Sequence, residues 1–95
     1  MADTTGEKLH LKVDEVVWRE VDEELVVLEL SSTTYLMLNG SAKHLWLRLA
    51  DGATSEELVT MLTDLYQISR EQARTDTESF LSNLTERKLL LDHES

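Results

Sequence analysis

The chain has 95 residues, a hydrophobic fraction of 41% and a formal net charge of −10, which suits one domain with a modest core and opposes binding to nucleic-acid phosphates. It has no cysteine, which excludes disulfides and thiolate metal sites. It has neither an apolar run that would span a bilayer nor the apolar stretch of a secretory signal, so the sequence indicates a cytoplasmic protein.

We expect a single domain over residues 9–91, with flexible ends at residues 1–8 and 92–95. Leu9, Leu11 and Val13 alternate with polar residues, a pattern that predicts a half-buried strand. Three β-rich runs follow at residues 16–21, 25–30 and 34–38, separated by short polar turns. These short spacings favour an antiparallel meander.

From Ser41 the apolar residues recur at helical spacing, with Trp46 on the side expected to enter the core. Ser41 is the expected N-cap of this helix, and Gly52 suits its C-cap. Capping-box patterns at residues 54–57 and 69–72 predict the starts of two more helices. We expect the second helix to bury Leu58, Met61, Leu62 and Leu65.

The third helix carries Ala73, Thr77, Phe80, Leu81 and Leu84 on one face, ends near residues 87–88, and is followed by Leu89-Leu-Leu91, which is expected to close the core. Because the strands come first and the helices follow, the sequence predicts an α+β fold. We expect a three-stranded antiparallel sheet followed by three helices, an arrangement like that of winged-helix proteins.

No group of residues resembles a catalytic or metal centre. His10, His44 and His93 lie on different expected elements without the ligand spacing of a zinc site. No serine sits in a glycine-flanked elbow, and the glycines are too isolated to cradle phosphate. The acidic pair Glu56-Glu57 is typical of a helix start. We therefore predict no enzymatic activity, no metal and no cofactor.

A winged-helix DNA-binding regulator is an alternative of another class. Its recognition helix needs cationic and amide side chains aimed at phosphates and base edges. The third helix offers three arginines against four acidic residues. This balance disfavours a polyanionic partner.

The strand expected at residues 34–38 has apolar side chains on both faces. Tyr35 and Met37 share one face, and Leu36 and Leu38 share the other. One face must pack on the helices, which leaves the other pair exposed. An exposed apolar pair on an edge strand promotes aggregation unless another strand covers it, so this strand is a candidate site for an added peptide.

An ordered set of motifs extends over residues 13–91. It comprises Val16-Val-Trp-Arg-Glu-Val21, Leu25-Val-Val-Leu28, Tyr35-Leu-Met-Leu-Asn39, Ala42, Leu45-Trp46, Leu49, Asp51-Gly52, Thr54-x-x-Glu57 and Phe80-Leu81-x-x-Leu84. This set resembles the pyrroloquinoline-quinone synthesis protein D type of peptide-binding domain, also called the RiPP recognition element. The resemblance implies a non-catalytic protein that binds the leader segment of a ribosomally made precursor peptide.

In that family the leader adds a strand to the sheet edge, in a groove beside the third helix. A short chain of this kind is most similar to the discrete subunit of split lasso-peptide systems. The resemblance then implies as partners the precursor leader peptide, a separate leader peptidase and a macrolactam cyclase, with no nucleic acid and no membrane. The alternative within the family is a peptide chaperone in pyrroloquinoline quinone synthesis, serving a radical-SAM enzyme.

The groove residues follow from helix geometry. At about 100° per residue, one flank of the third helix's core stripe holds Asp76, Phe80, Asn83 and Arg87, and the other holds Arg74, Glu78 and Leu81. We favour the first flank because it combines an aromatic side chain, an amide and a charge. The predicted peptide site is Thr34, Tyr35, Leu36, Met37, Leu38, Asp76, Phe80, Asn83, Leu84 and Arg87. Arg87→Glu is expected to leave the fold intact, with Arg87 pairing to an acidic leader side chain.

Overall fold

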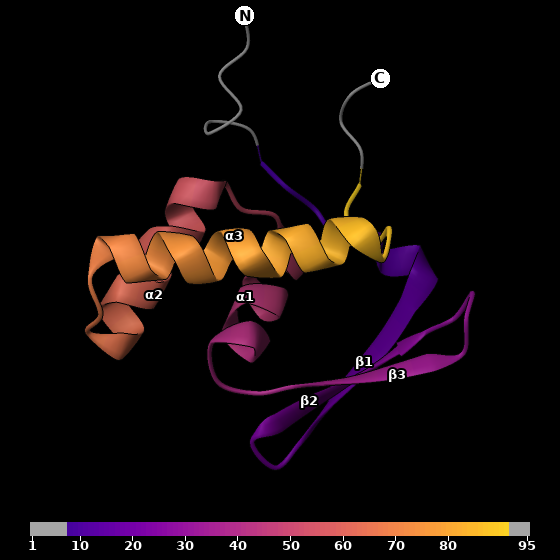
Figure 1. The fold of residues 1–95 in the computed structure, drawn as a ribbon. Helices are drawn as coiled ribbons and strands as arrows, with labels where there is room; N and C mark the ends of the chain where they lie inside the picture. The colour runs from indigo at the N-terminus through magenta and orange to yellow at the C-terminus, as the bar shows by residue number, and fades with distance from the viewer. Residues whose placement is uncertain (1–7, 92–95) are drawn as a thin grey trace, which may run out of the picture.

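A computed structural model describes residues 8–91 and has the predicted α+β architecture (Figure 1). The expected flexible ends lie, apart from Lys8, outside these residues. A short 3-10 helix, Val13–Glu15, precedes the sheet. The strands are β1 (Val16–Val21), β2 (Glu24–Glu29) and β3 (Thr34–Leu38), and the helices are α1 (Gly40–Asp51), α2 (Ser55–Tyr66) and α3 (Arg70–Glu86).

The sheet is an antiparallel meander in the order β1-β2-β3. Val27 lies opposite both Trp18 and Leu36, and Leu28 lies opposite both Val17 and Tyr35. Since directly opposed residues share a face, the first set faces the helices and the second forms the outer face. Val27 is fully buried, whereas Val17 is 56% exposed.

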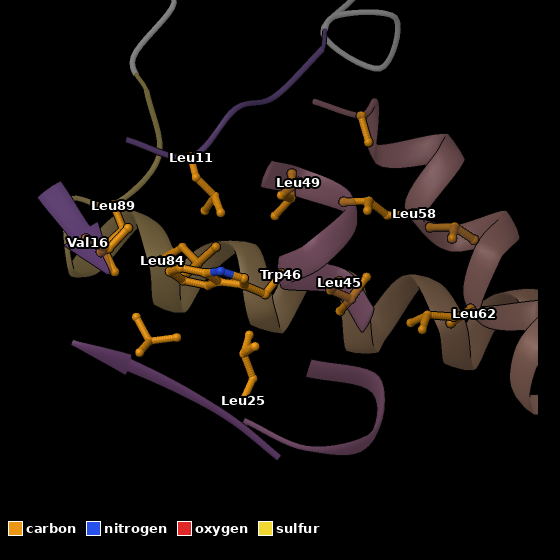
Figure 2. Close-up of a cluster of buried hydrophobic side chains, with 14 residues drawn as sticks. Leu11, Val16, Leu25, Leu45, Trp46, Leu49, Leu58, Leu62, Leu84 and Leu89 are labelled. Atoms are coloured by element: carbon orange, nitrogen blue, oxygen red, sulfur yellow. The ribbon is translucent and has the colours of Figure 1, made fainter. Parts of the chain in front are cut away.

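The core lies between the inner face of the sheet and the three helices, with Trp46 near its centre (Figure 2). Trp46 is fully buried, as predicted. Its ring meets that of Trp18 edge to face, with centroids 5.6 Å apart, a favoured aromatic geometry. Leu25 from the sheet and Leu84 from α3 belong to the same cluster, so one tryptophan packs between strand and helix layers.

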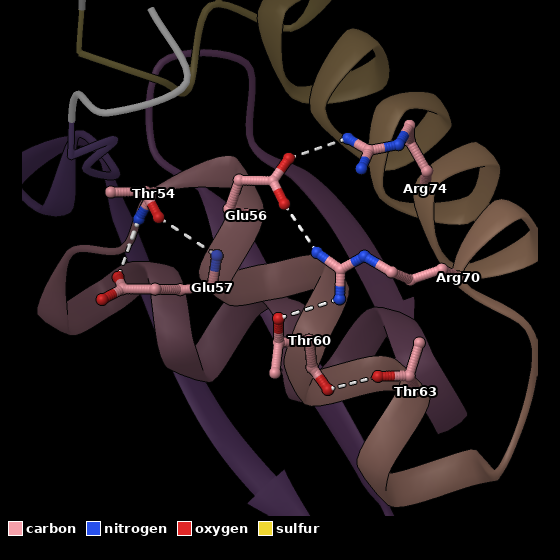
Figure 3. A network of polar contacts seen from close by, with 7 residues as sticks. All are labelled: Thr54, Glu56, Glu57, Thr60, Thr63, Arg70 and Arg74. Atoms are coloured by element: carbon pink, nitrogen blue, oxygen red, sulfur yellow. Dashed lines mark hydrogen bonds and ion pairs between the residues drawn. The ribbon is translucent and has the colours of Figure 1, made fainter.

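Local capping signals set three of the six helix ends, at Gly52, Thr54 and Ser69. Thr54 and Glu57 form the predicted reciprocal capping box at the start of α2 (Figure 3). Ser69 accepts a hydrogen bond from the Gln72 backbone, but the Gln72 side chain turns to Asp76 instead of completing a box. The prediction of Ser41 as N-cap was wrong, because α1 begins at Gly40 with Asn39 as its N-cap.

Gly52 is the C-cap of α1, as predicted, and has a φ of +95°. A Cβ at this position would lie 2.5 Å from Cε1 of His10. Glycine is therefore needed for both the backbone conformation and the close approach of the histidine ring.

Two predictions about the periphery were wrong. Residues 9–13 form no strand; Leu9 and Leu11 make isolated bridges to Ala53 and Leu90, and Val13 begins the 3-10 helix. The buried face of α2 consists of Leu58, Val59 and Leu62. Leu65, which was expected in the core, lies outside this face and is 51% exposed. In the last segment Leu89 is buried, whereas Leu91 is about half exposed.

Candidate functional site

The strand β3 forms one edge of the sheet and pairs with β2 only. An edge strand leaves one row of backbone N–H and C=O groups without partners in the sheet. Beyond this edge, β3 runs through Asn39 directly into α1. The start of α1 therefore lies at the Leu38 end of this strand.

A groove with a volume of about 460 Å³ opens between β3, α1 and α3. Its floor is apolar, and its wall on α3 carries polar and charged groups. It is lined by Leu36, Met37, Leu38, Ser41, Ala42, Leu45, Trp46, Asp76, Ser79, Phe80, Asn83, Leu84 and Arg87. Apolar side chains combined with a few placed polar groups are the usual lining of a ligand site.

Most of the predicted site residues meet in this groove. Those on α3, from Asp76 to Leu84, and its C-cap Arg87 line it together with residues 36–38 of β3. Thr34 and Tyr35 do not line it. Sequence reasoning missed Ser79, which helical spacing places beside Asp76 and Phe80. It assigned Trp46 to the core, which is confirmed, and this fully buried ring lies beneath the groove.

Tyr35 and Met37 are exposed, as expected from the strand pattern, at 66% and 61%. Tyr35 belongs to the outer face of the sheet, where it borders a shallow hollow with Val17, Val26 and Leu28. Leu36 and Leu38 on the inner face of β3 line the groove, and Tyr35 on the outer face extends an apolar patch. Met37 shares the face of Tyr35 but also lines the groove.

Arg87 stands at one end of the groove and is already paired. Its Nη1 donates to Oε2 of Glu29 at 2.8 Å, and its Nε donates to Oδ1 of Asn83 at 3.1 Å. The Glu29 side chain is only 8% exposed. This contact overturns the expectation that Arg87→Glu leaves the fold intact, because a second carboxylate would then face a buried one.

Asp76 lies toward the other end of the groove and is half-buried. Its Oδ1 accepts a hydrogen bond from Nε2 of Gln72 at 2.9 Å. Within residues 8–91, no lysine, arginine or histidine forms an ion pair with this carboxylate. The two ends of the groove thus differ in charge balance.

The opposite flank of α3 faces α2. Arg70 and Arg74 both donate to the Glu56 carboxylate, at 2.6 and 2.9 Å (Figure 3). The hydrogen bonds from Arg74 and then Arg70 hold the pKa of Glu56 below its usual value of 4.5, and Glu56 in turn raises the pKa of Arg74. Arg74 is therefore engaged between helices and does not line the groove.

Residues 8–91 contain no cluster of three metal-ligating side chains, and His93 lies outside that range. None of the helices in this part of the chain has the length and apolarity that spanning a bilayer requires.

The comparison with known families decides the classification. Residues 24–90, from β2 to the end of the core, match the model of coenzyme PQQ synthesis protein D (PqqD). The chain belongs to the PqqD family. No curated protein matches it.

Two solved structures resemble this PqqD-family chain. One is described as TbiB1 in complex with the TbiA(beta) leader peptide; it is 30% identical, with a TM-score of 0.77 over 86% of this chain and 95% of that one. The other is described as lasso peptide synthetase B1 complexed with the leader peptide; it is 27% identical, with a TM-score of 0.77 over 88% of this chain and 98% of that one. Both similar proteins are leader-peptide complexes.

Proposed function

We propose that this PqqD-family chain is a non-catalytic, cytoplasmic recognition element that binds the leader segment of a ribosomally made precursor peptide. The leader adds to the edge of β3 as a strand and places side chains in the groove beside α3. The chain then delivers the leader to a separate leader peptidase and a macrolactam cyclase in lasso-peptide biosynthesis.

The observation that carries this proposal is the continuity of a free sheet edge with a groove of mixed apolar and polar lining. Residues 36–38 contribute both the edge and one wall of the groove. Backbone pairing along an edge supplies affinity, and pockets for alternate side chains supply specificity. The leader complexes of the two similar proteins support the same class of ligand.

The chemistry of the groove supports binding rather than a reaction. Its polar side chains are Ser41, Asp76, Ser79, Asn83 and Arg87. It therefore contains no histidine or cysteine that would activate a nucleophile. The net charge of −10 also opposes the alternative of a DNA-binding regulator.

Titration calorimetry tests the proposal directly. The first ligand is the TbiA(beta) leader, and the second is the leader encoded by a short reading frame next to this protein's own gene. We expect binding in the micromolar range or tighter, about −8 kcal/mol or better, without metal or nucleotide. Absence of heat with both leaders, for protein shown to be folded by circular dichroism, would refute leader binding.

The delivery step needs its own measurement. Cleavage of the full precursor by the neighbouring peptidase should require this chain, and a precursor lacking its leader should not be processed. Neighbouring genes for quinone synthesis, with no peptidase or cyclase, would instead favour the PqqD-type role that the family description names.

A further inference from the structure

The two charged side chains that line the groove differ in whether another charge balances them. The groove is lined by one carboxylate, Asp76, and one guanidinium, Arg87. The positive charge of Arg87 is balanced by the nearly buried Glu29 at 2.8 Å. Asp76 has only the neutral Gln72 amide as a partner among the described residues. The groove therefore carries one unmatched negative charge.

The register of the sheet places this charge along β3. Glu29 pairs with Thr34, so Arg87 marks the Thr34 end of the strand. Asp76 lies about three helical turns earlier on α3, or about 16 Å away. It therefore lies toward the end where β3 leads through Leu38 into Ser41, both of which line the groove with it.

We propose that the groove selects leader segments that place a lysine or arginine side chain against Asp76. This inference rests on the proposed function and adds a charge requirement to it. A bound peptide removes water from the half-buried Asp76 carboxylate, which is costly unless the peptide supplies a partner. A cationic side chain supplies a charge-assisted hydrogen bond, stronger than one between neutral groups.

The same balance argues against an acidic leader side chain at Arg87. A peptide carboxylate there would approach the existing Glu29 carboxylate, and like charges in a desolvated site repel. The acidity of the whole chain, −10, also attracts a cationic rather than an anionic segment. This reverses the expectation drawn from the sequence, in which Arg87 was the charge-selecting residue.

Strand direction fixes where the cation lies in the leader. All strand pairs in the sheet are antiparallel, and antiparallel pairing is slightly the more stable kind per residue. A peptide antiparallel to β3 enters at the Leu38 end and leaves at the Thr34 end. The cationic residue therefore lies in the N-terminal part of the bound segment.

A displayed library of random 16-residue peptides, selected on the immobilised full chain, tests this inference. Wild-type protein should enrich lysine or arginine at one position of the aligned peptides, N-terminal to the apolar residues. Asp76→Asn should lose that preference, and Asp76→Lys should replace it with aspartate or glutamate at the same position. The matched control is Glu78→Gln, which changes an exposed acid of α3 outside the groove and should select like the wild type.

Affinities of one selected peptide complete the test. Replacing its enriched cation by glutamine should weaken binding to wild-type protein about tenfold, the scale of a charge-assisted hydrogen bond. The same replacement should have little effect on binding to Asp76→Asn. Circular dichroism and urea unfolding establish that each variant is folded.

The outcomes separate this inference from the proposed function. Enrichment of apolar peptides without a basic position, or the same basic position with Asp76→Asn, would overturn the Asp76 assignment and leave peptide binding standing. Enrichment of acidic residues near the C-terminal end of the selected peptides would assign charge selection to Arg87 instead. Failure of every variant to enrich any peptide would overturn both the inference and the proposed function.

Discussion

The pair formed by Glu29 and Arg87 leads to a quantitative prediction about stability. The Glu29 side chain is 8% exposed and the Arg87 side chain 37% exposed. Arg87→Ala would leave a nearly buried carboxylate without its cation. Removing one partner of a fully buried pair costs about 3–5 kcal/mol. Because solvent reaches Arg87 and screens part of the interaction, we expect a loss of about 2–3 kcal/mol.

Urea unfolding at neutral pH, followed by tryptophan fluorescence, measures this loss because Trp46 is fully buried in the folded protein. In a separate thermal unfolding experiment, the melting temperature of Arg87→Ala should be about 10–20 °C lower than that of the wild type, given the usual scaling for a domain of this size. Arg19→Ala is the matched control, since Arg19 is exposed and makes no ion pair within the described residues. It should change stability by less than about 0.5 kcal/mol.

A double-mutant cycle identifies the cause. Glu29→Gln removes the buried charge, so adding Arg87→Ala to it should cost much less than Arg87→Ala alone. If Arg87→Ala unfolds at the same urea concentration as Arg19→Ala, the pair contributes nothing to stability. Arg87 would then be free to receive a ligand, and the charge balance assigned to the groove would be wrong.

Three further predictions concern other elements. Exchange of the backbone amides of residues 34–38 should slow when leader binds, while α2 changes little; unchanged exchange at 34–38 would exclude strand addition there. Gly52→Ala should lower the melting temperature more than Gly40→Ala, because only at Gly52 would the new Cβ meet another side chain, the His10 ring at 2.5 Å. The hydrogen bond from the Thr54 backbone N–H is the main cause of the lowered pKa of Glu57. The ionised Glu57 carboxylate therefore stabilises the fold fully above its unfolded pKa, near 4.5, and this stabilisation is lost as the pH falls through the lower folded pKa. The difference in unfolding free energy between wild type and Glu57→Gln, measured by urea unfolding across this range, should vanish in acid.

The sequence predicted the elements whose signals are local. The bounds of β3 were predicted correctly because a short apolar run between polar turn residues and Asn39-Gly40 defines them. The capping box at Thr54 was predicted because its signal consists of four consecutive residues. The region of Leu9 and Leu11 was not predictable in this way. Their burial arises from bridges to Ala53 and Leu90, which are distant in sequence, and not from membership of a regular strand.

The same distinction applies to the groove. Helical periodicity alone brought Asp76, Phe80, Asn83 and Arg87 onto one flank, and the structure places that flank beside β3. Periodicity gives no information about what each side chain already contacts. The partner of Arg87 lies 58 residues away, on β2, so its charge looked available from the sequence although a buried carboxylate holds it.

The two ends of the described chain lie next to each other, since the Leu91 N–H donates to the His10 carbonyl at 2.8 Å and Leu11 bridges Leu90. The two segments meet near the C-terminal part of α3 (Figure 1). Adjacent ends permit circular permutation and insertion into another domain. The fold can therefore be inserted into a surface loop of an enzyme through both ends at once, with the edge of β3 left free. Such an insertion offers a route to artificial enzymes that carry their own substrate-recruiting domain.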